Sequence, residues 1–459
     1  MSALWTSDEI AAATGGSAST RFEASGAAFD SREVEPGFLF IALRGEATDG
    51  HLFLDRAFAA GAAGALVSAD TPHPHVRVAD TMAALNDLGR ASRARSGARI
   101  CGVTGSVGKT GTKEALYAAL DRSAPGAAHR SVKSYNNHTG VPLSLARMPR
   151  EARFGVFEMG MNHEGELAAL TRLVRPHVAI VTAIAPAHRE YFASEAAIAD
   201  AKSEIFQGLE PGGTAIIPYD SPHRDRLIAA ARPHAARIVT FGLGKGADVH
   251  ARDHVPASGG GSLVAAILPG AELTFTISQP GDHWVSNALA VVAAVEALGG
   301  DLAAAGLALA DLPGLKGRGA RHVIRVEGGE ALLIDESYNA NPASMAATLS
   351  AFGAQGTAGR RIAVLGAMRE LGEASEDFHA GLAAPVEAAG VERAILVGKE
   401  MESLAKALGQ KAKITHVPDS AAATELVRNE VRAGDSVLVK GSNSVGLAAL
   451  VDALTGGKS

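Results

Sequence analysis

A glycine-rich turn between an apolar segment and a helix-forming segment constrains this chain most. The stretch "CGVTGSVGKTGTKEAL" begins at Cys101, and its turn consists of Gly105, Ser106, Val107, Gly108, Lys109, Thr110 and Gly111. The residues before the turn are typical of a buried strand, and those after it favour a helix. A strand that runs straight into a helix belongs to an α/β layer, so the turn predicts an α/β fold around it.

This turn has the features of a phosphate-binding loop. Glycines let backbone N–H groups point at an anion, and the helix N-terminus adds a favourable dipole. We expect Lys109 to reach the β- and γ-phosphates of ATP and Thr110 to offer its hydroxyl to Mg²⁺. Val103 stands where the usual spacing has a glycine, and Gly105 supplies the turn instead. The alternative is a tight strand–helix turn with an exposed lysine, which the flanking strand and helix disfavour.

Length and composition narrow the class of protein. A chain of 459 residues is too long for one core and suggests about two to four domains. The net charge of −6 offers no basic surface for nucleic acid. No apolar run approaches the ~20 residues that span a bilayer, and the N-terminus lacks a basic and then apolar leader. We therefore expect a cytoplasmic protein without a membrane partner, and its single Cys101 in a buried strand.

The chain divides into three blocks, which we expect to be domains covering residues 1–96, 97–318 and 319–459. The first block has short strands "FLFIAL" and "GALVSA" around a helix "HLFLDRAFAAG". The second alternates strands such as "RFGVFEMG" and "HVAIVTAIAP" with helices, one of them running from Ser194 to Gly208, and holds a hairpin around Pro269 and Gly270. The third has four strand units, "ALLIDESYNANP", "RIAVLGAM", "RAILVG" and "DSVLVKGS", each followed by a helix, which indicates a largely parallel sheet.

Polar residues at the ends of these strands are candidates for the site, because ligands of parallel sheets bind beyond the carboxyl ends of the strands. Glu158 is either a magnesium ligand or a helix-capping or surface residue. His188 follows a strand and is either a ligand or a structural histidine. Lys202 lies within a helix, where a solvated lysine is the default. Asp335 ends a strand, and Asn341 is expected to cap the next helix.

Several motifs in order along the chain resemble the Mur ligase family of peptidoglycan synthesis. They are "FDSREVEPGFLFIALRGEATDGHLFLDRAFAAGA", "GVTGSVGKTGTKE", "NNHTGVPLSLARMP", "EMGMNHEGEL", "AHREYF", "IADAKSEIF" and "GDHWVSNALA". The family's ATP loop has the same shortened spacing around Val103. The resemblance implies three α/β domains: a small uridine-binding domain, a central mononucleotide-binding domain with a parallel sheet and phosphate loop, and a C-terminal Rossmann-like domain.

The resemblance also implies a reaction. "DESYNANPASM" and "LGAMRELGEASEDFH" resemble the members that join D-Ala-D-Ala to UDP-N-acetylmuramoyl-tripeptide, although Ala367 replaces a frequent aspartate and receives no role. The expected cofactors are ATP and Mg²⁺, the reaction passes through an acyl phosphate, and a monomer is our default. The alternatives are a diamino-acid-adding ligase, a folylpolyglutamate synthase, a non-catalytic ATP-binding module and a nucleic-acid-dependent NTPase.

Roles carry over from the family by position in these motifs. The resemblance implies catalytic roles for Lys109, His188 and Lys202. Metal ligands would be Thr110, Glu158, His188 and Lys202, the last as a carbamate. The nucleotide would contact residues 105–111, Asn287, Arg318 and Asp335. The uridine diphosphate end would contact Ser31 and Arg32, and the muramoyl portion Asn136 and Asn137. Candidates for the D-Ala-D-Ala region are Tyr338, Asn339 and Asn341.

Overall fold

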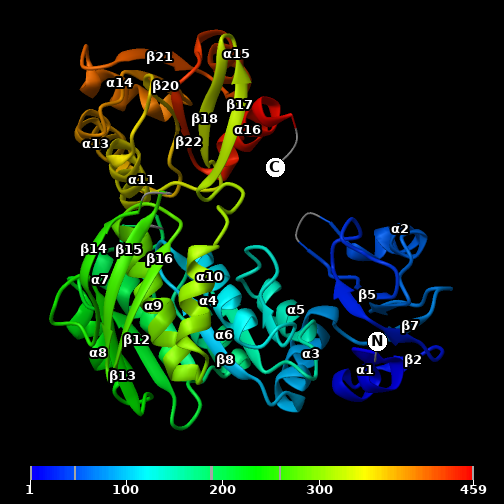
Figure 1. The fold of residues 1–459 in the computed structure, drawn as a ribbon. Helices are drawn as coiled ribbons and strands as arrows, with labels where there is room; N and C mark the ends of the chain where they lie inside the picture. The colour runs from blue at the N-terminus through cyan, green and yellow to red at the C-terminus, as the bar shows by residue number, and fades with distance from the viewer. Residues whose placement is uncertain (1–2, 46–47, 187–189, 258–259, 457–459) are drawn as a thin grey trace.

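The computed structural model describes residues 3–45, 48–186, 190–257 and 260–456, which form three α/β domains (Figure 1). Each domain is built on its own sheet, of five, nine and six strands in chain order. In the described part of the chain, no helix combines the length and apolar character needed to cross a bilayer.

The N-terminal domain has a five-stranded sheet whose strands β4 to β7 are parallel. In spatial order the strands are β2 (Ser17–Ala18), β7 (His75–Arg77), β6 (Gly64–Val67), β5 (Phe38–Ile41) and β4 (Gly26–Ala28). A separate pair joins β1 (Trp5–Thr6) to β3 (Glu23–Ala24), and the helices are α1 (Ser7–Thr14), η1 (Gly50–Phe53) and α2 (Leu54–Ala59). The two predicted strands are confirmed. The single helix predicted at "HLFLDRAFAAG" is instead a 3₁₀ turn followed by a short α-helix.

Helix α3 (Thr81–Arg95) connects the first domain to the second and packs against α5 (Gly140–Ala146). Its side chains Leu85 and Leu88 share a core with residues of α5. Arg93 is buried and donates hydrogen bonds to the carbonyl oxygens of Val174 and Arg175, each at 2.8 Å. These bonds satisfy carbonyls at the end of a helix of the central domain, so α3 is attached to both domains.

The central domain has a nine-stranded mixed sheet that contains the phosphate loop. Its order is β16 (Ala271–Ile277), β15 (Ser262–Leu268), β14 (Val249–Pro256), β13 (Arg237–Gly242), β12 (Thr214–Pro218), β11 (Val178–Val181), β8 (Arg99–Thr104), β10 (Phe154–Glu158) and β9 (Ala128–Arg130). The strands from β9 to β14 are parallel, whereas β15 and β16 form the predicted antiparallel hairpin around Pro269 and Gly270. Cys101 lies fully buried in β8, as predicted.

Helices cover both faces of this sheet, each over its own apolar core. One face carries α4 (Lys109–Ser123), α9 (Asp282–Leu298) and α10 (Leu302–Ala310). The other face carries α5, α6 (Glu166–Val174), α7 (Glu195–Ser203), η2 (Glu204–Gly208) and α8 (Arg224–Ala231). Helix α9 is apolar around most of its circumference, and its segment 288–295 is almost wholly buried, as expected for a helix enclosed on all sides. The helix predicted from Ser194 to Gly208 is confirmed as α7 with η2, and Ser194 is its N-cap.

The C-terminal domain has a six-stranded sheet in the order β17 (Ala320–Val326), β18 (Gly329–Glu336), β22 (Ser436–Lys440), β19 (Arg361–Gly366), β20 (Arg393–Val397) and β21 (Lys413–Val417). All neighbours except β17 and β18 are parallel, so the four predicted strand units are confirmed. Its helices are α11 (Pro342–Ala354), α12 (Ser375–Ala380), α13 (Ala383–Ala388), α14 (Glu402–Leu408), α15 (Ser420–Glu430) and α16 (Leu447–Thr455), with 3₁₀ turns η3 (Gly372–Ala374), η4 (Lys399–Met401) and η5 (Asn443–Val445).

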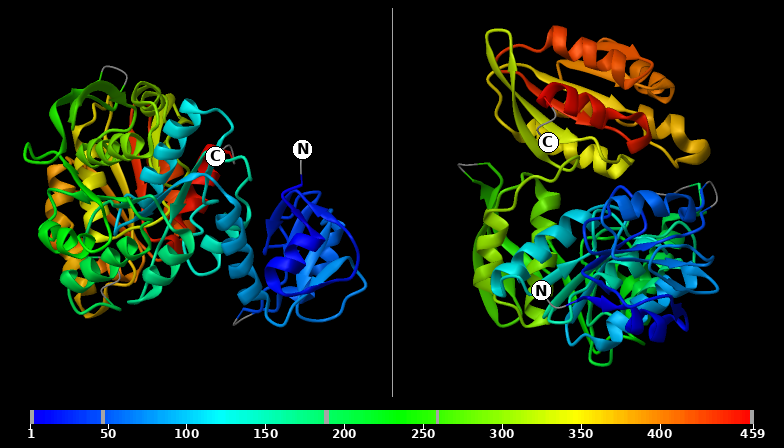
Figure 2. Two further views of the ribbon diagram at one scale, coloured as in Figure 1. Left: turned by 90° about the horizontal axis from the view of Figure 1, so that it is seen from below. Right: turned by 90° about the vertical axis from the view of Figure 1, so that its right-hand side faces the viewer.

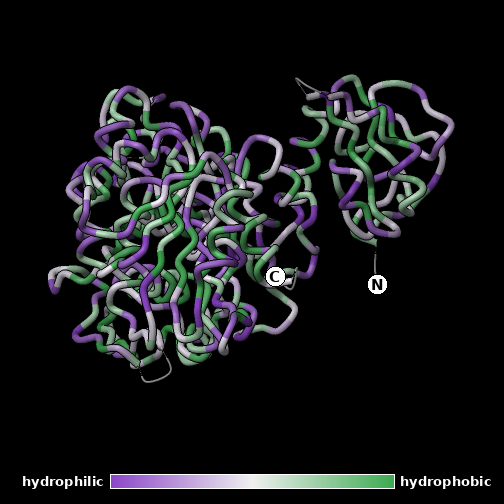
Figure 3. The backbone as a smooth tube through the Cα atoms, turned by 90° about the horizontal axis from the view of Figure 1, so that it is seen from above, coloured by the Kyte–Doolittle hydropathy of each residue, from purple (hydrophilic) through white to green (hydrophobic). Residues whose placement is uncertain are grey.

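The three domains are arranged around the end of the central sheet that carries the phosphate loop. The C-terminal domain lies over the central domain, and the N-terminal domain stands to one side, joined through α3 (Figure 2). Hydrophobic segments run through the interior of the N-terminal domain, and also through the body formed by the other two domains, in the hydropathy-coloured trace (Figure 3). A cavity opens where the central and C-terminal domains meet.

Candidate nucleotide and metal site

The phosphate loop connects β8 to α4 in a backbone conformation that requires glycine. Gly108 is the N-cap of α4 with φ of +85°, and a Cβ there would lie 2.9 Å from Oδ1 of Asn287. At Gly105 a Cβ would lie 1.9 Å from Oγ1 of Thr182. Thr182 follows β11, and its hydroxyl donates to the carbonyl oxygen of Val107 at 2.5 Å. The loop is thus fixed from the neighbouring strand and closely approached by α9.

Lys109 is the first residue of α4 and lines the cavity beside this loop. Its Nζ donates to the carbonyl oxygen of Gly105 at 2.6 Å, which folds the side chain back over the loop. Desolvation lowers the pKa of Lys109 from its ordinary value, with Glu158 opposing that shift and Arg318 adding to it. An anion at the loop would replace the carbonyl as the partner of this ammonium group and favour its charged form.

The cavity has a volume of about 410 Å³ and is lined by both domains. The central domain contributes the phosphate loop, Asn287 and Trp284. The hinge contributes Arg318, and the C-terminal domain contributes a loop after β18. Other lining residues are Ser106, Thr110, Asn136, Glu158, Thr182, Lys202, His283, Glu336, Tyr338, Asn339, Asn341 and Lys440. A cavity of this size, lined by many polar and charged side chains, suits a polar small-molecule ligand such as a nucleotide.

Thr110 and Glu158 present a pair of oxygen donors beside the loop. The Thr110 hydroxyl donates to Oε2 of Glu158 at 2.8 Å, and Asn136 donates from Nδ2 to Oε1 of the same carboxylate at 2.8 Å. Glu158 is 1% exposed. Hydroxyl and carboxylate oxygens are the donors that Mg²⁺ prefers, so this pair fits the predicted ion. In the described segments no group of three or more His, Cys, Asp and Glu side chains is arranged to hold a metal ion.

Lys202 differs from the solvated lysine that is the default for its position. Its side chain is 1% exposed and lines the same cavity. Desolvation lowers the pKa of Lys202 well below its ordinary value, and the nearby charge of Lys109 lowers it further. Burial of this amine overturns the solvated default, and because burial disfavours its charged form, Lys202 is a potential nucleophile.

Arg318 lines the hinge side of the cavity, and the buried Asp335 bonds to the residue before it. The Arg318 guanidinium stacks on the Tyr338 ring, 4.2 Å from its centroid, and both residues line the cavity. Asp335 is buried and does not line the cavity. Its carboxylate accepts from the Gly317 N–H at 2.7 Å and from the N–H and hydroxyl of Ser337 at 3.1 and 2.6 Å. Asp335 therefore holds the two turns that carry Arg318 and Tyr338.

The predicted asparagines separate into lining and capping residues. Asn136 lines the cavity and contacts Glu158, whereas Asn137 does not line it and uses Oδ1 to accept from the Gly140 N–H at the start of α5. Asn341 is the N-cap of α11, as predicted, and also faces the cavity. Tyr338 and Asn339 are exposed in the same wall, beside Arg318, which was assigned to the nucleotide. Their assignment to D-Ala-D-Ala stays a prediction.

One further pair of predicted residues, Ser31 and Arg32, lies away from this cavity. Ser31 and Arg32 are in the N-terminal domain, where Ser31 is buried and Arg32 forms an ion pair with Asp30 at 2.6 Å. The Arg32 hydrogen bond, the largest influence, holds the pKa of Asp30 at about 2 despite partial desolvation. His188 lies outside the described residues, so its predicted metal and catalytic roles stay predictions.

Some cavity residues were not predicted from the sequence. Lys440 ends β22, is 3% exposed, and donates to Oε2 of Glu336 at 3.3 Å and to the carbonyl oxygen of Asn339 at 3.1 Å. Its position just beyond a strand, like that of Thr182, was the available signal. His283, at the start of a helix, offered no such signal. Neither did Lys113, a buried lysine within α4 that does not line the cavity.

Comparisons with known proteins agree with this geometry along the whole chain. The family models that match are the Mur ligase family, catalytic domain, at residues 23–93, the Mur ligase middle domain at 103–295, and the Mur ligase, glutamate ligase domain, at 322–443. The UDP-N-acetylmuramoyl-tripeptide–D-alanyl-D-alanine ligases of Bacillus subtilis and Escherichia coli are each 34% identical over 435 residues, covering 93% of this chain and 92% of each relative.

Solved structures of Mur ligases are similar to this chain over nearly its full length. MurF from Acinetobacter baumannii has a TM-score of 0.83 at 31% identity, covering 98% of this chain and 99% of that one. MurF ligase from Thermotoga maritima, solved in complex with ADP, has a TM-score of 0.77 at 25% identity, covering 94% and 97%. The fold and the site define a three-domain ATP-dependent ligase built around a phosphate loop. The chain belongs to the Mur ligase family.

The close approach of Asn287 to the phosphate loop gives a first prediction. Gly108→Ala places a methyl group 2.9 Å from Asn287 at a left-handed φ, so ADP affinity should fall by about 10-fold or more, by ~1.4 kcal/mol or more. Calorimetric titration with MgADP measures this. Gly126→Ala is the matched control, because Gly126 has a φ of +74° and open space around it. Equal affinities of the two variants would contradict the geometry.

Proposed function

We propose that this protein joins D-Ala-D-Ala to UDP-N-acetylmuramoyl-tripeptide at the expense of ATP and releases ADP and phosphate. The product is the pentapeptide precursor of peptidoglycan, which connects the protein to cell-wall growth, shape and division. The observation that carries the proposal is Lys109 beside the Thr110–Glu158 pair, in a cavity whose opposite wall belongs to the C-terminal domain. The relatives' names supply the substrates.

The chemistry explains why positive charge is gathered at this place. The terminal carboxylate of the tripeptide attacks the γ-phosphate, and both reacting groups are anions. Lys109 is placed to lower their repulsion, and Thr110 and Glu158 would hold a magnesium ion that adds to this effect. The amine of the dipeptide then attacks the acyl phosphate, the tetrahedral intermediate collapses, and phosphate leaves.

The remaining assignments extend the proposal over the three domains. Ser31 and Arg32 would bind the uridine diphosphate end. Asn136 would contact the muramoyl portion in addition to donating its hydrogen bond to Glu158. Asn287 and Arg318 would hold the adenosine part of ATP, with Asp335 positioning Arg318. The working boundaries remain 1–96, 97–318 and 319–459. Cytoplasmic location and a monomeric state stay predictions. Closure of the C-terminal domain on ATP would complete the site.

Phosphate release tests the proposed substrates. With ATP and Mg²⁺, release should require both UDP-N-acetylmuramoyl-tripeptide and D-Ala-D-Ala. Turnover only with the dipeptide-precursor nucleotide and a free diamino acid would identify the diamino-acid ligase instead. If neither substrate set gives phosphate release but the protein still binds ATP, a non-catalytic ATP-binding module would be favoured.

Lys109→Ala tests the site itself. Removing the ammonium group should lower kcat by at least ~10²-fold while the circular dichroism spectrum stays unchanged, because the charge acts on the reacting anions. Lys245→Ala is the matched control, since Lys245 is an exposed lysine of the central domain. Substantial turnover by Lys109→Ala would refute the role given to this residue.

We also propose that Lys202 reacts with carbon dioxide to form a carbamate, in which the amine nitrogen bonds to carbon and a proton is released. The product is an anion that would bind a metal ion. Three observations support this proposal: the Lys202 amine is buried, its pKa is lowered, and it lies next to the phosphate loop.

Acetate rescue tests the carbamate. Lys202→Ala should lose most activity, and added acetate should restore part of it by supplying the missing carboxylate. An active Lys202→Ala variant, or an inactive one that acetate does not restore, would contradict the carbamate.

A further inference from the structure

Lys113 is a second buried lysine near the phosphate loop, and the proposed reaction does not use it. It lies one helical turn after Lys109 on α4, and its side chain is 0% exposed. Isolated ammonium groups are costly to bury, so its partners must account for its position.

The partners of Lys113 belong mainly to one segment of chain. Its Nζ donates to the carbonyl oxygens of Lys133 at 2.6 Å and Ser131 at 3.2 Å, and forms an ion pair with Glu114 at 2.7 Å. The segment 131–136 connects β9 towards α5 and includes Lys133 at a left-handed φ of +51°. That conformation is unfavourable for a lysine, and the bond from Lys113 to its carbonyl helps to hold it.

The same segment surrounds the metal-binding carboxylate. The Ser131 hydroxyl accepts from the Glu158 N–H at 3.0 Å, and Asn136 donates to Oε1 of Glu158. The Gly160 N–H donates to the carbonyl oxygen of Asn136 at 2.8 Å. Lys113 Nζ itself lies 4.0 Å from Oε2 of Glu158. The backbone and the carboxylate of Glu158 are therefore oriented from one segment that Lys113 anchors.

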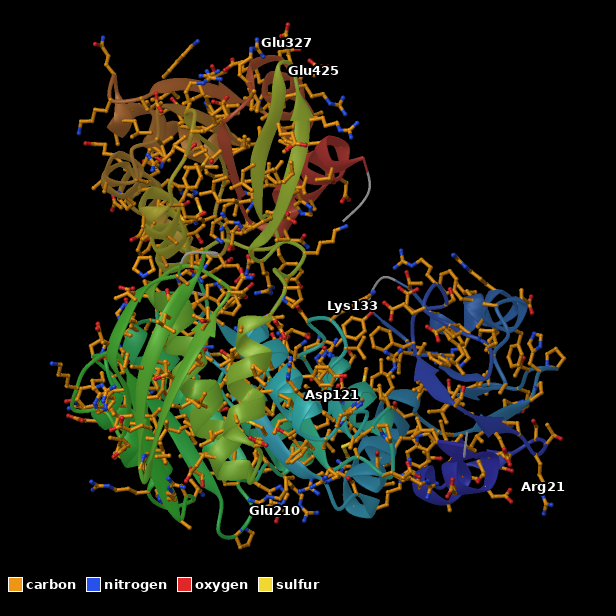
Figure 4. The ribbon with its side chains drawn as sticks, in the orientation of Figure 1. Arg21, Asp121, Lys133, Glu210, Glu327 and Glu425 are labelled. Atoms are coloured by element: carbon orange, nitrogen blue, oxygen red, sulfur yellow. The ribbon has the colours of Figure 1, made fainter. Side chains whose placement is uncertain are left out.

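The outer side of this segment contacts the N-terminal domain. Glu33 accepts a hydrogen bond from Tyr135 at 2.8 Å and pairs with Lys133, and the rings of Phe29 and Tyr135 lie 5.3 Å apart. Lys133 lies on the side of the central domain that faces the N-terminal domain (Figure 4). Although desolvation of Glu33 opposes it, the bonds from Lys133 and Tyr135 keep the pKa of Glu33 below its ordinary value. The loop of Glu33 also carries Ser31 and Arg32.

We propose that Lys113 is a positioning residue that fixes the segment 131–136, and that this segment transmits the placement of the N-terminal domain from Glu33 to Glu158. Binding of the nucleotide-sugar substrate in the first domain is thereby coupled to the geometry of the metal site. The inference rests on the metal role proposed above for Thr110 and Glu158.

Metal affinity measured without turnover tests this inference. Mn²⁺ is titrated into the full-length protein with saturating ADP, and free Mn²⁺ is followed by electron paramagnetic resonance. Lys113→Met should weaken Mn²⁺ binding by ~10-fold, because supports of a ligand typically contribute that much. ADP affinity in EDTA should be unchanged. Glu33→Ala should weaken Mn²⁺ binding by a smaller factor of about 2 to 5, because it acts through the segment.

Controls separate positioning from general damage. Lys245→Met removes an exposed lysine and should leave Mn²⁺ affinity unchanged. Ser131→Ala removes only the hydroxyl that receives the Glu158 N–H, so it should weaken Mn²⁺ binding even if Lys113→Met folds poorly. Unchanged Mn²⁺ affinity in Lys113→Met and Ser131→Ala would overturn the positioning role, and no effect of Glu33→Ala would overturn the coupling. If the wild-type protein does not bind Mn²⁺, the proposed metal role of Thr110 and Glu158 is overturned too. If Mn²⁺ binding responds to the variants as expected but the protein shows no ligase turnover, only the proposed substrates are refuted.

Discussion

The hydrogen bond between Thr110 and Glu158 joins the helix after the phosphate loop to the end of the neighbouring strand. Both residues are almost fully buried, so the surroundings must supply hydrogen-bond donors to the polar oxygens of Glu158 at fixed positions. Thr182 fixes the phosphate loop, Asn136 fixes the second carboxylate oxygen, and Ser131 fixes the backbone. The parallel order of β11, β8 and β10 brings these groups to one edge of the sheet.

The C-terminal domain completes a site that the central domain only begins. Arg318 and Tyr338 are stacked and held by the buried Asp335, and they form the wall opposite Asn287. A reaction between two anions and an amine requires exclusion of water after all groups are assembled. Because the essential groups lie on two domains, closure of the domains would both assemble the site and exclude water from it.

Much of this architecture was predictable from local pattern. Continuous apolar runs identified β8, β10 and β11, because strands buried on both faces tolerate few polar residues. The strand β17 was not predicted, since it alternates buried and exposed residues at the sheet edge.

Among the site residues, the phosphate loop, Glu158 and Arg318 were predicted from motif and position. The environments of Lys202 and Lys113 were not, because burial of a lysine within a helix depends on what packs against it from distant parts of the chain. Asn137 and Asp335 were predicted to contact ligands, but their polar groups accept hydrogen bonds from nearby backbone N–H groups and do not line the cavity.

Transfer of oxygen from substrate to phosphate tests the central claim most directly. UDP-N-acetylmuramoyl-tripeptide labelled with ¹⁸O in its terminal carboxylate is incubated with ATP, Mg²⁺ and D-Ala-D-Ala, and the released phosphate is examined by mass spectrometry. Formation of an acyl phosphate predicts that each phosphate carries one ¹⁸O, because the carboxylate oxygen leaves with phosphorus when the amine displaces it. Phosphate without ¹⁸O would show that water had attacked ATP and would contradict a ligase that activates the carboxylate.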